Sequence, residues 1–259
     1  MLKKLLKYDF KTLLQTMLPI YGIALILSIV SNIFLRINKL TPVFKIPASF
    51  ITGLAVLVSI GMVFITLIMG MINFYKQTVK DEGYLLHTLP VTKDSIIISK
   101  LTSVTILSML SVLVMGITLA ITLNIDPSKI IEVIKKMLEF FKDYKLTGLL
   151  LLISVIIGQI LNTLLMYLSI SFGQKHPTNK LLYSIIYGVV TYNVTQILTM
   201  LIYLPFLSNG KFIEALEQDL PPAGIINTML GVTIGLSLIT SIIYYIFTKK
   251  NLENKLNLE

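Results

Sequence analysis

The sequence predicts an all-α membrane protein with six transmembrane helices, and three observations carry this prediction. Of the 259 residues, 55% are apolar and only 14% are charged, against about a quarter in an ordinary soluble domain. The mean hydropathy is +0.84. Six stretches lack Asp, Glu, Lys, Arg and His, and each is long enough to cross about 30 Å of hydrocarbon as a helix. These stretches are residues 17–35, 48–72, 101–123, 146–170, 181–204 and 223–247.

The apolar stretches are expected to be helices because backbone groups in lipid must bond within their own segment. A barrel is excluded because its strands would alternate polar and apolar residues. The composition also excludes a soluble globular protein and a disordered one. We therefore expect residues 1–259 to form a single transmembrane domain.

The charges in the loops predict the orientation of the spans. Six spans place both termini on one side, together with the loops 73–100 and 171–180. This side carries 13 of the 22 basic residues, so the positive-inside rule places it in the cytoplasm. Of the 22 basic residues in the whole sequence, 21 are Lys and one is Arg. This bias is typical of AT-rich bacteria. We therefore expect a multi-pass protein of a bacterial cell membrane. Its net charge is +9, and we expect its basic side chains to contact anionic lipid headgroups and not nucleic acid.

Two segments outside the spans have the pattern of amphipathic helices. Residues 1–16 carry leucines on one face and lysines on the other, which predicts an interfacial elbow helix that leads into the first span at Pro19. Residues 126–145 predict an external helix, with Asp126 suited to the N-cap and Pro127 to the first helical position. Its apolar stripe would lie on the outer leaflet or cover the outer mouth of the bundle, and the sequence favours neither.

The cytoplasmic loop 73–100 is the most informative segment for function. A charged run ends before Gly83, and a cluster of Tyr and Leu then extends to Pro90. Thr92 can cap the next helix, and Asp94 falls in its first turn. Since a short cytoplasmic turn cannot bury such a cluster within a six-helix bundle, the cluster must contact headgroups or another protein. An aromatic anchor with a polar rim is typical of protein contacts.

The sequence lacks the motifs of common catalytic sites. It contains no phosphate-binding loop G-x-x-x-x-G-K-[ST], no H-E-x-x-H and no serine nucleophile elbow. Its two histidines, His87 and His176, are isolated in loops, and it has no Cys. We therefore expect no enzyme activity, no metal and no directly bound cofactor. An ion-coupled carrier is disfavoured because it needs an ionisable residue near the midplane of a span.

Neutral polar and small residues in the spans predict helix packing. Interhelical hydrogen bonds of about 1 kcal/mol each account for most of the polar residues. The pairs Gly116-x-x-x-Ala120 and Gly231-x-x-x-Gly235 predict close approach of neighbouring helices. The second span is rich in Met, and Met-rich surfaces adapt to varied apolar ligands. Ordinary packing is nevertheless the commoner role for any one of these residues.

The loop between the second and third spans also resembles that of a known family. The residues that carry the resemblance are Phe74-Tyr75-Lys76, Asp81-Glu82-Gly83-Tyr84-Leu85, Thr88-Leu89-Pro90-Val91 and Ser99-Lys100-Leu101. Together with the six-span layout, they resemble the small permeases of type-2 ABC (ATP-binding-cassette) exporters from Gram-positive bacteria. Members of this family export antimicrobial or toxic peptides such as phenol-soluble modulins, confer immunity to such peptides, or move lipids.

The resemblance implies a division of labour between subunits. Such permeases work as pairs with a second copy or a homologue. Each binds a cytoplasmic ABC ATPase subunit, which holds ATP and Mg and hydrolyses the ATP. The loop would then be a coupling helix inserted into the ATPase, with Ser171–Lys180 as a smaller second contact. The coupling residues would be Asp81, Glu82, Gly83, Tyr84, Leu85, Leu86, Leu89 and Pro90.

The resemblance also implies that spans two and five of both copies line the substrate path. The path residues would be Met62, Phe64, Met69, Asn193 and Gln196. Because the spans lack charge, we expect an amphipathic or lipid-like cargo such as a hydrophobic peptide. Two alternatives stay open. One is a membrane-anchored interaction, sensory or immunity protein that recruits a cytoplasmic partner without transport, and the other is the less favoured ion-coupled carrier.

Overall fold

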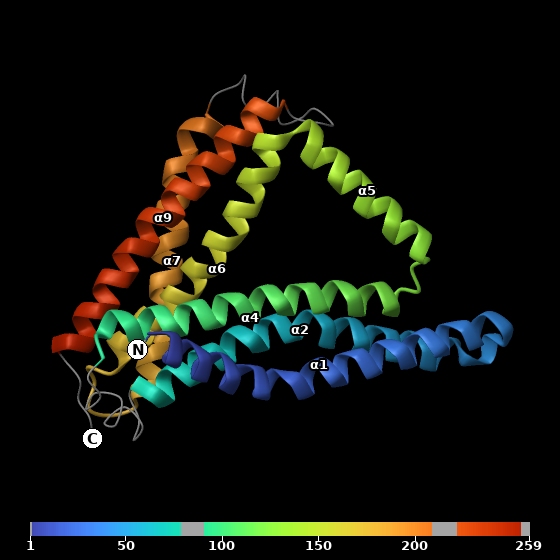
Figure 1. The fold of residues 1–259 in the computed structure, drawn as a ribbon, viewed down its shortest axis with the longest axis horizontal. Helices are drawn as coiled ribbons and strands as arrows, with labels where there is room; N and C mark the ends of the chain where they lie inside the picture. The colour runs from blue at the N-terminus through green and yellow to red at the C-terminus, as the bar shows by residue number, and fades with distance from the viewer. Residues whose placement is uncertain (1, 79–90, 209–221, 255–259) are drawn as a thin grey trace. The chain divides into compact units, whose positions relative to one another are not determined.

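The computed structural model describes residues 2–78, 91–208 and 222–254, and this part of the chain is helical with no strand. Six of its seven α-helices, all except α5, are long and apolar enough to cross a membrane, which confirms the predicted all-α, six-span fold. The helices in Figure 1 are α1 (Leu2–Leu40), α2 (Lys45–Thr78), α4 (Lys93–Thr122), α5 (Pro127–Asp143), α6 (Lys145–Gly173), α7 (Lys180–Leu207) and α9 (Ala223–Asn254), and a short 3-10 turn, η1 (Pro42–Phe44), joins α1 to α2.

The N-terminal amphipathic segment is helical as predicted, and it continues into the first span without a break. Pro19 lies inside the 39-residue helix α1 and does not separate two helices at an elbow. Proline removes one backbone hydrogen bond, but a transmembrane helix tolerates it where neighbouring groups satisfy the freed carbonyl.

The chain divides into two compact units, and the first comprises Met1–Asn73 and Ser95–Lys136. A buried apolar cluster holds α1, α2 and α4 together, and it includes Met17, Met62 and Leu107. Gly70 is required for this packing, because a Cβ there would lie 2.6 Å from Cγ2 of Val104. Hydroxyl groups cross the same interface, as in other transmembrane bundles: the Ser111 hydroxyl pairs with Tyr21 Oη and with Thr66 Oγ1, each at 2.6 Å.

The second unit comprises Phe74–Asp94 and Met137–Glu259, and in it α6 packs against both α7 and α9. The start of α7 lies close to the end of α6, because a Cβ on Gly173 would be 2.6 Å from the backbone nitrogen of Ser184. Two hydroxyl pairs bridge α7 and α9: Thr195 with Tyr244, and Tyr203 with Thr233.

The prediction of close packing at Gly116, Gly231 and Gly235 is wrong for contacts between described residues within each unit. A Cβ at any of these positions would meet no atom within 4 Å. Close approach occurs at Gly70 and Gly173 instead. The spacing of small residues alone does not indicate which face a helix turns to its neighbours.

Candidate functional site

The candidate functional site is a pair of contacts, here called attachments, that flank residues 79–90 in the sequence. One lies at the end of α2 and the other at the start of α4. The predicted coupling residues lie outside the described residues: Asp81, Glu82, Gly83, Tyr84, Leu85, Leu86, Leu89 and Pro90. The nearest helical turns on either side of the segment 79–90 are described. They are the last turn of α2 and the first turn of α4.

The first attachment is an aromatic stack between α2 and α6. The ring centroids of Phe74 and Tyr167 lie 3.9 Å apart and the ring planes are 10° from parallel. Both side chains have 0% of their surface exposed. Thr78 is also buried, and its hydroxyl donates a hydrogen bond of 2.6 Å to the carbonyl oxygen of Phe74. The last turns of α2 are therefore held against α6 at Phe74, and Thr78 is buried one turn later.

The second attachment is polar and joins α4 to α9. Lys249 Nζ donates to Asp94 Oδ2 at 2.7 Å, and the Tyr245 hydroxyl donates to the other carboxylate oxygen. Asp94 and Lys249 lie outside the charge-free stretches 101–123 and 223–247. These hydrogen bonds, from Lys249 first and then Tyr245, hold the pKa of the Asp94 carboxyl below its ordinary value. The same bond with Asp94 raises the pKa of Lys249.

The loop after α6 is fixed by aromatic rings within the same unit. His176 stacks on Tyr183 with ring centroids 3.7 Å apart, and its Nε2 lies 3.1 Å from the Tyr187 hydroxyl. Lys175 Nζ lies 4.4 Å from the ring centroid of Phe172, a distance suited to a cation–π interaction. The segment Ser171–Lys180 is thus a short connection held by contacts with its own flanking helices. The family resemblance implies that this segment is a second contact with the ATPase.

The end of α9 also contacts the start of this connection. Asn251 Nδ2 donates to the Ser171 hydroxyl at 3.0 Å, and both side chains are buried. The helix that binds Asp94 through Lys249 therefore also binds the end of α6. All of these contacts lie within the second unit. The described residues on the two sides of 79–90 thus contact α6 at one attachment and α9 at the other.

The predicted path residues are distributed over both units. Met62 is fully buried in the apolar cluster of the first unit, and Met69 packs against that cluster. Phe64 is 63% exposed on another face of α2. In the second unit Asn193 and Gln196 are exposed on α7, and Asn193 Nδ2 donates to the carbonyl oxygen of Val189 in its own helix.

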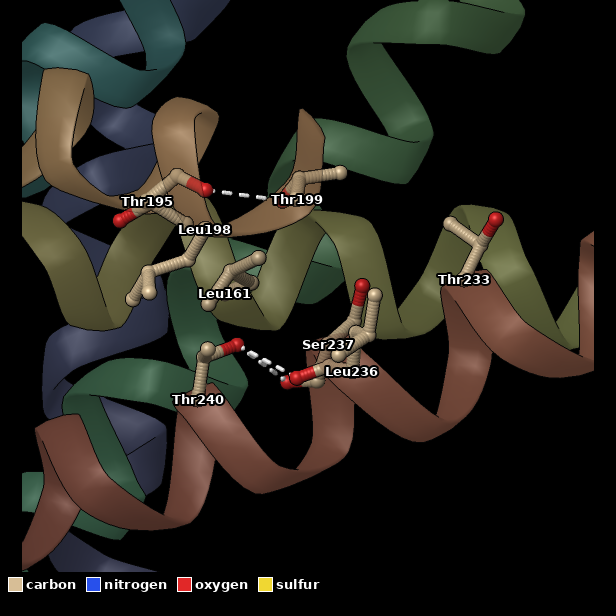
Figure 2. A pocket seen from close by; sticks show the side chains of 8 residues that line it. All are labelled: Leu161, Thr195, Leu198, Thr199, Thr233, Leu236, Ser237 and Thr240. Carbon is tan, nitrogen blue, oxygen red and sulfur yellow. Dashed lines mark hydrogen bonds between the residues drawn. The ribbon is translucent and has the colours of Figure 1, made fainter. Parts of the chain in front are cut away.

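A small pocket opens among three helices of the second unit (Figure 2). Its volume is about 50 Å³, and one water in the liquid takes about 30 Å³, so it is too small for a peptide. Its lining surface is mostly apolar, and several hydroxyl groups of the lining residues bond backbone carbonyls of their own helices. The lining residues are Leu161 from α6, Thr195, Leu198 and Thr199 from α7, and Thr233, Leu236, Ser237 and Thr240 from α9.

The first unit contains a buried ion pair that was not predicted from the sequence. Lys100 Nζ donates to Asp9 Oδ1 at 2.9 Å, the Ser99 hydroxyl donates to Oδ2 at 2.6 Å, and both charged side chains are less than 10% exposed. A signal was present in the sequence, because Asp9 stands on the apolar face of the amphipathic segment, and a buried carboxylate needs a partner. The partner itself could not be identified, since 91 positions separate the two residues.

No protein-family model, curated protein or solved structure matches this chain. Among the described residues, no cluster of three or more His, Cys, Asp or Glu side chains could hold a metal ion. The candidate site is therefore defined by its two attachments, the Phe74–Tyr167 stack and the Asp94–Lys249 ion pair, and by the sequence between them.

Proposed function

We propose that this chain is the transmembrane subunit of an ATP-driven exporter of the type-2 ABC class. In this proposal it pairs with a second copy or a homologue in a bacterial cell membrane, with both termini in the cytoplasm. A separate cytoplasmic ATPase subunit binds ATP and Mg and supplies the energy. The cargo is an amphipathic or hydrophobic peptide, and the chain itself carries out no chemical step.

The observation that carries the proposal is the double attachment of the segment 79–90 to one helical unit. One end of this segment follows the buried Phe74–Tyr167 stack, and the other precedes Asp94, which binds Lys249. A segment held in this way is suited to transmit force, because neither end can move without α6 or α9. The proposed coupling residues Tyr84 and Leu85 lie between these attachments.

A bundle with two alternative packings can convert such a movement into a change of access across the membrane. The proposed ATPase closes on ATP and displaces the docked segment, and the segment moves the helices of the second unit. The charge-free spans favour an apolar cargo. Within the second unit, the exposed Asn193 and Gln196 offer amide contacts to it.

The docking step is tested by photo-crosslinking in cells that express the full-length chain. A photoreactive phenylalanine analogue replaces Tyr84, and a matched analogue replaces Val133, which is 57% exposed on the predicted external helix. We expect position 84 to crosslink a protein that contains the sequence G-x-x-x-x-G-K-[ST], and position 133 not to do so. Crosslinks from position 84 to lipid alone would overturn the proposal.

The transport step separates this proposal from a protein that only recruits a partner. The double substitution Tyr84→Asp/Leu85→Asp is expected to release the ATPase on purification and to abolish ATP-dependent peptide uptake into inverted vesicles. The unsubstituted pair should transport, and its ATPase rate should rise when peptide is added. A stable complex without either response would favour the recruiting protein, and uptake driven by a pH gradient without ATP would favour an ion-coupled carrier.

A further inference from the structure

Helix α5 divides cleanly into an apolar half and a polar half. An α-helix turns by about 100° per residue, which places all of its isoleucine, leucine, methionine and phenylalanine side chains within about half of the circumference. These apolar residues are exposed along most of the helix: Ile134 is 51% exposed, Met137 55% and Leu138 64%. Such a continuous apolar face requires a partner.

The charges on the polar half follow a definite order. Four lysines lie at the two borders with the apolar half: Lys135 and Lys142 at one border, and Lys129 and Lys136 at the other. The acidic residues Glu132, Glu139 and Asp143 occupy the middle of the polar half. Lysine side chains at such a border can bury their methylene stems and extend the ammonium group to the headgroup level. This order matches a phosphate layer beside the apolar face and water above the acidic residues.

Short connections hold both ends of α5 at one membrane surface. Only residues 123–126 separate it from α4, and only Tyr144 separates it from α6. The 17-residue helix is about 25 Å long, so it cannot project far from the surface at which both neighbouring spans end. Its axis must run along the membrane.

The contact between Phe141 and Gly148 fixes which face turns toward the hydrocarbon. Gly148 lies in the first turn of α6, inside the apolar stretch 146–170, and a Cβ there would be 2.2 Å from Cδ1 of Phe141. Phe141 belongs to the apolar half of α5. Its ring centroid lies 6.0 Å from that of Phe140, and Phe140 packs on Tyr144 at 5.3 Å. Tyrosines such as Tyr144 are enriched where a span meets the headgroups.

We propose that α5 is a bilayer-binding helix that lies in the outer headgroup layer. Its apolar half enters the boundary of the acyl chains, and its four border lysines contact lipid phosphates. Because three acidic residues nearly balance the four lysines, apolar insertion holds the helix and the phosphates orient it. The proposal depends on the six-span fold, and the choice of the outer leaflet depends on the predicted orientation of the spans. It is independent of the proposed transport.

The absence of Trp from the sequence allows a direct test with a single introduced fluorophore. The full-length variants Ile134→Trp and Glu139→Trp are reconstituted into vesicles of phosphatidylcholine and phosphatidylglycerol, with and without brominated acyl chains. We expect brominated lipid to quench Ile134→Trp strongly and its emission to be blue-shifted, at a depth of about 5–10 Å into the interface. Aqueous iodide, present on both sides of the bilayer, is expected to quench Glu139→Trp instead.

Two results would overturn this assignment. If neither brominated lipid nor iodide quenches Ile134→Trp, protein covers the apolar face, as in a lid over the bundle or a contact with a second copy. If iodide quenches it as strongly as Glu139→Trp, the face lies in water. Leu138→Trp probes the same face at a position that is 64% exposed, and it decides the question if the variant at Ile134 is not monodisperse.

Discussion

Phe74 of α2 stacks face to face on Tyr167 of α6, and neither ring is exposed. The stack lies four positions before Thr78, where the described part of α2 ends. The chain therefore enters the segment 79–90 from a fixed point on α6. In the proposed function, a movement of that segment is transmitted to α6 through this contact. A weaker stack should therefore transmit less of the movement.

Replacing Phe74 by Leu should weaken coupling more than folding. Leu fills much of the ring volume but removes the stack, which is worth about 0.5–1.5 kcal/mol beyond the buried area. In vesicles that hold the chain and its proposed ATPase, we expect ATP hydrolysis to persist while peptide transport per ATP falls. Phe50→Leu on the same helix is the control, because Phe50 is 71% exposed and has no proposed role in the substrate path. Equal losses in both variants would contradict this role of the stack.

The second attachment should not depend on pH in the neutral range. The bonds from Lys249 and Tyr245 lower the pKa of Asp94, so its stabilising contribution is complete above the ordinary carboxyl pKa of about 3.9 and is lost as the pH falls through the folded-state value. The raised pKa of Lys249 keeps that group charged in the same range. We expect the difference in thermal midpoint between the wild-type chain and Asp94→Asn to be constant from about pH 5 to 8. A difference that grows steadily toward pH 5 would show that the folded chain raises the pKa of the Asp94 carboxyl and does not lower it.

The sequence predicted the spans and the helical structure of α5 well because both depend on local patterns. Runs without charge mark the membrane helices, and α5 begins at Pro127, directly after Asp126, as expected. The continuity of α1 through Pro19 could not be predicted, because it depends on tertiary neighbours that satisfy the helix. The partners of Phe74 and Asp94 lie 93 and 155 positions away, and no local pattern indicates such pairs. The predicted coupling residues between these anchors, including Tyr84 and Leu85, stay predictions.

The orientation of the chain can be tested by chemical labelling, since the sequence contains no Cys. Lys3 and Ser128 are both exposed, near the N-terminus and at the start of α5. We expect a membrane-impermeant maleimide to label Ser128→Cys in intact cells and to label Lys3→Cys only after the membrane is permeabilised. The reverse pattern would place both termini outside and would remove the segment 79–90 from the reach of a cytoplasmic ATPase.

The buried pair of Asp9 and Lys100 should be more sensitive to the loss of one partner than to the loss of both. Lys100→Met leaves the buried carboxylate with Ser99 as its described hydrogen-bond partner, and breaking a buried ion pair costs about 3–5 kcal/mol. The double variant Asp9→Leu/Lys100→Met removes both charges and adds apolar contacts, so we expect it to unfold at a higher temperature in detergent than Lys100→Met alone. Lys136→Met is the matched control, because its ion pair with Glu132 is more than half exposed on both sides and such pairs contribute at most about 1 kcal/mol. If the double variant is no more stable than the single one, the pair does not stabilise α1 against α4 by mutual neutralisation, and the hydrogen bond from Ser99 to Asp9 becomes the main contact between these two helix ends.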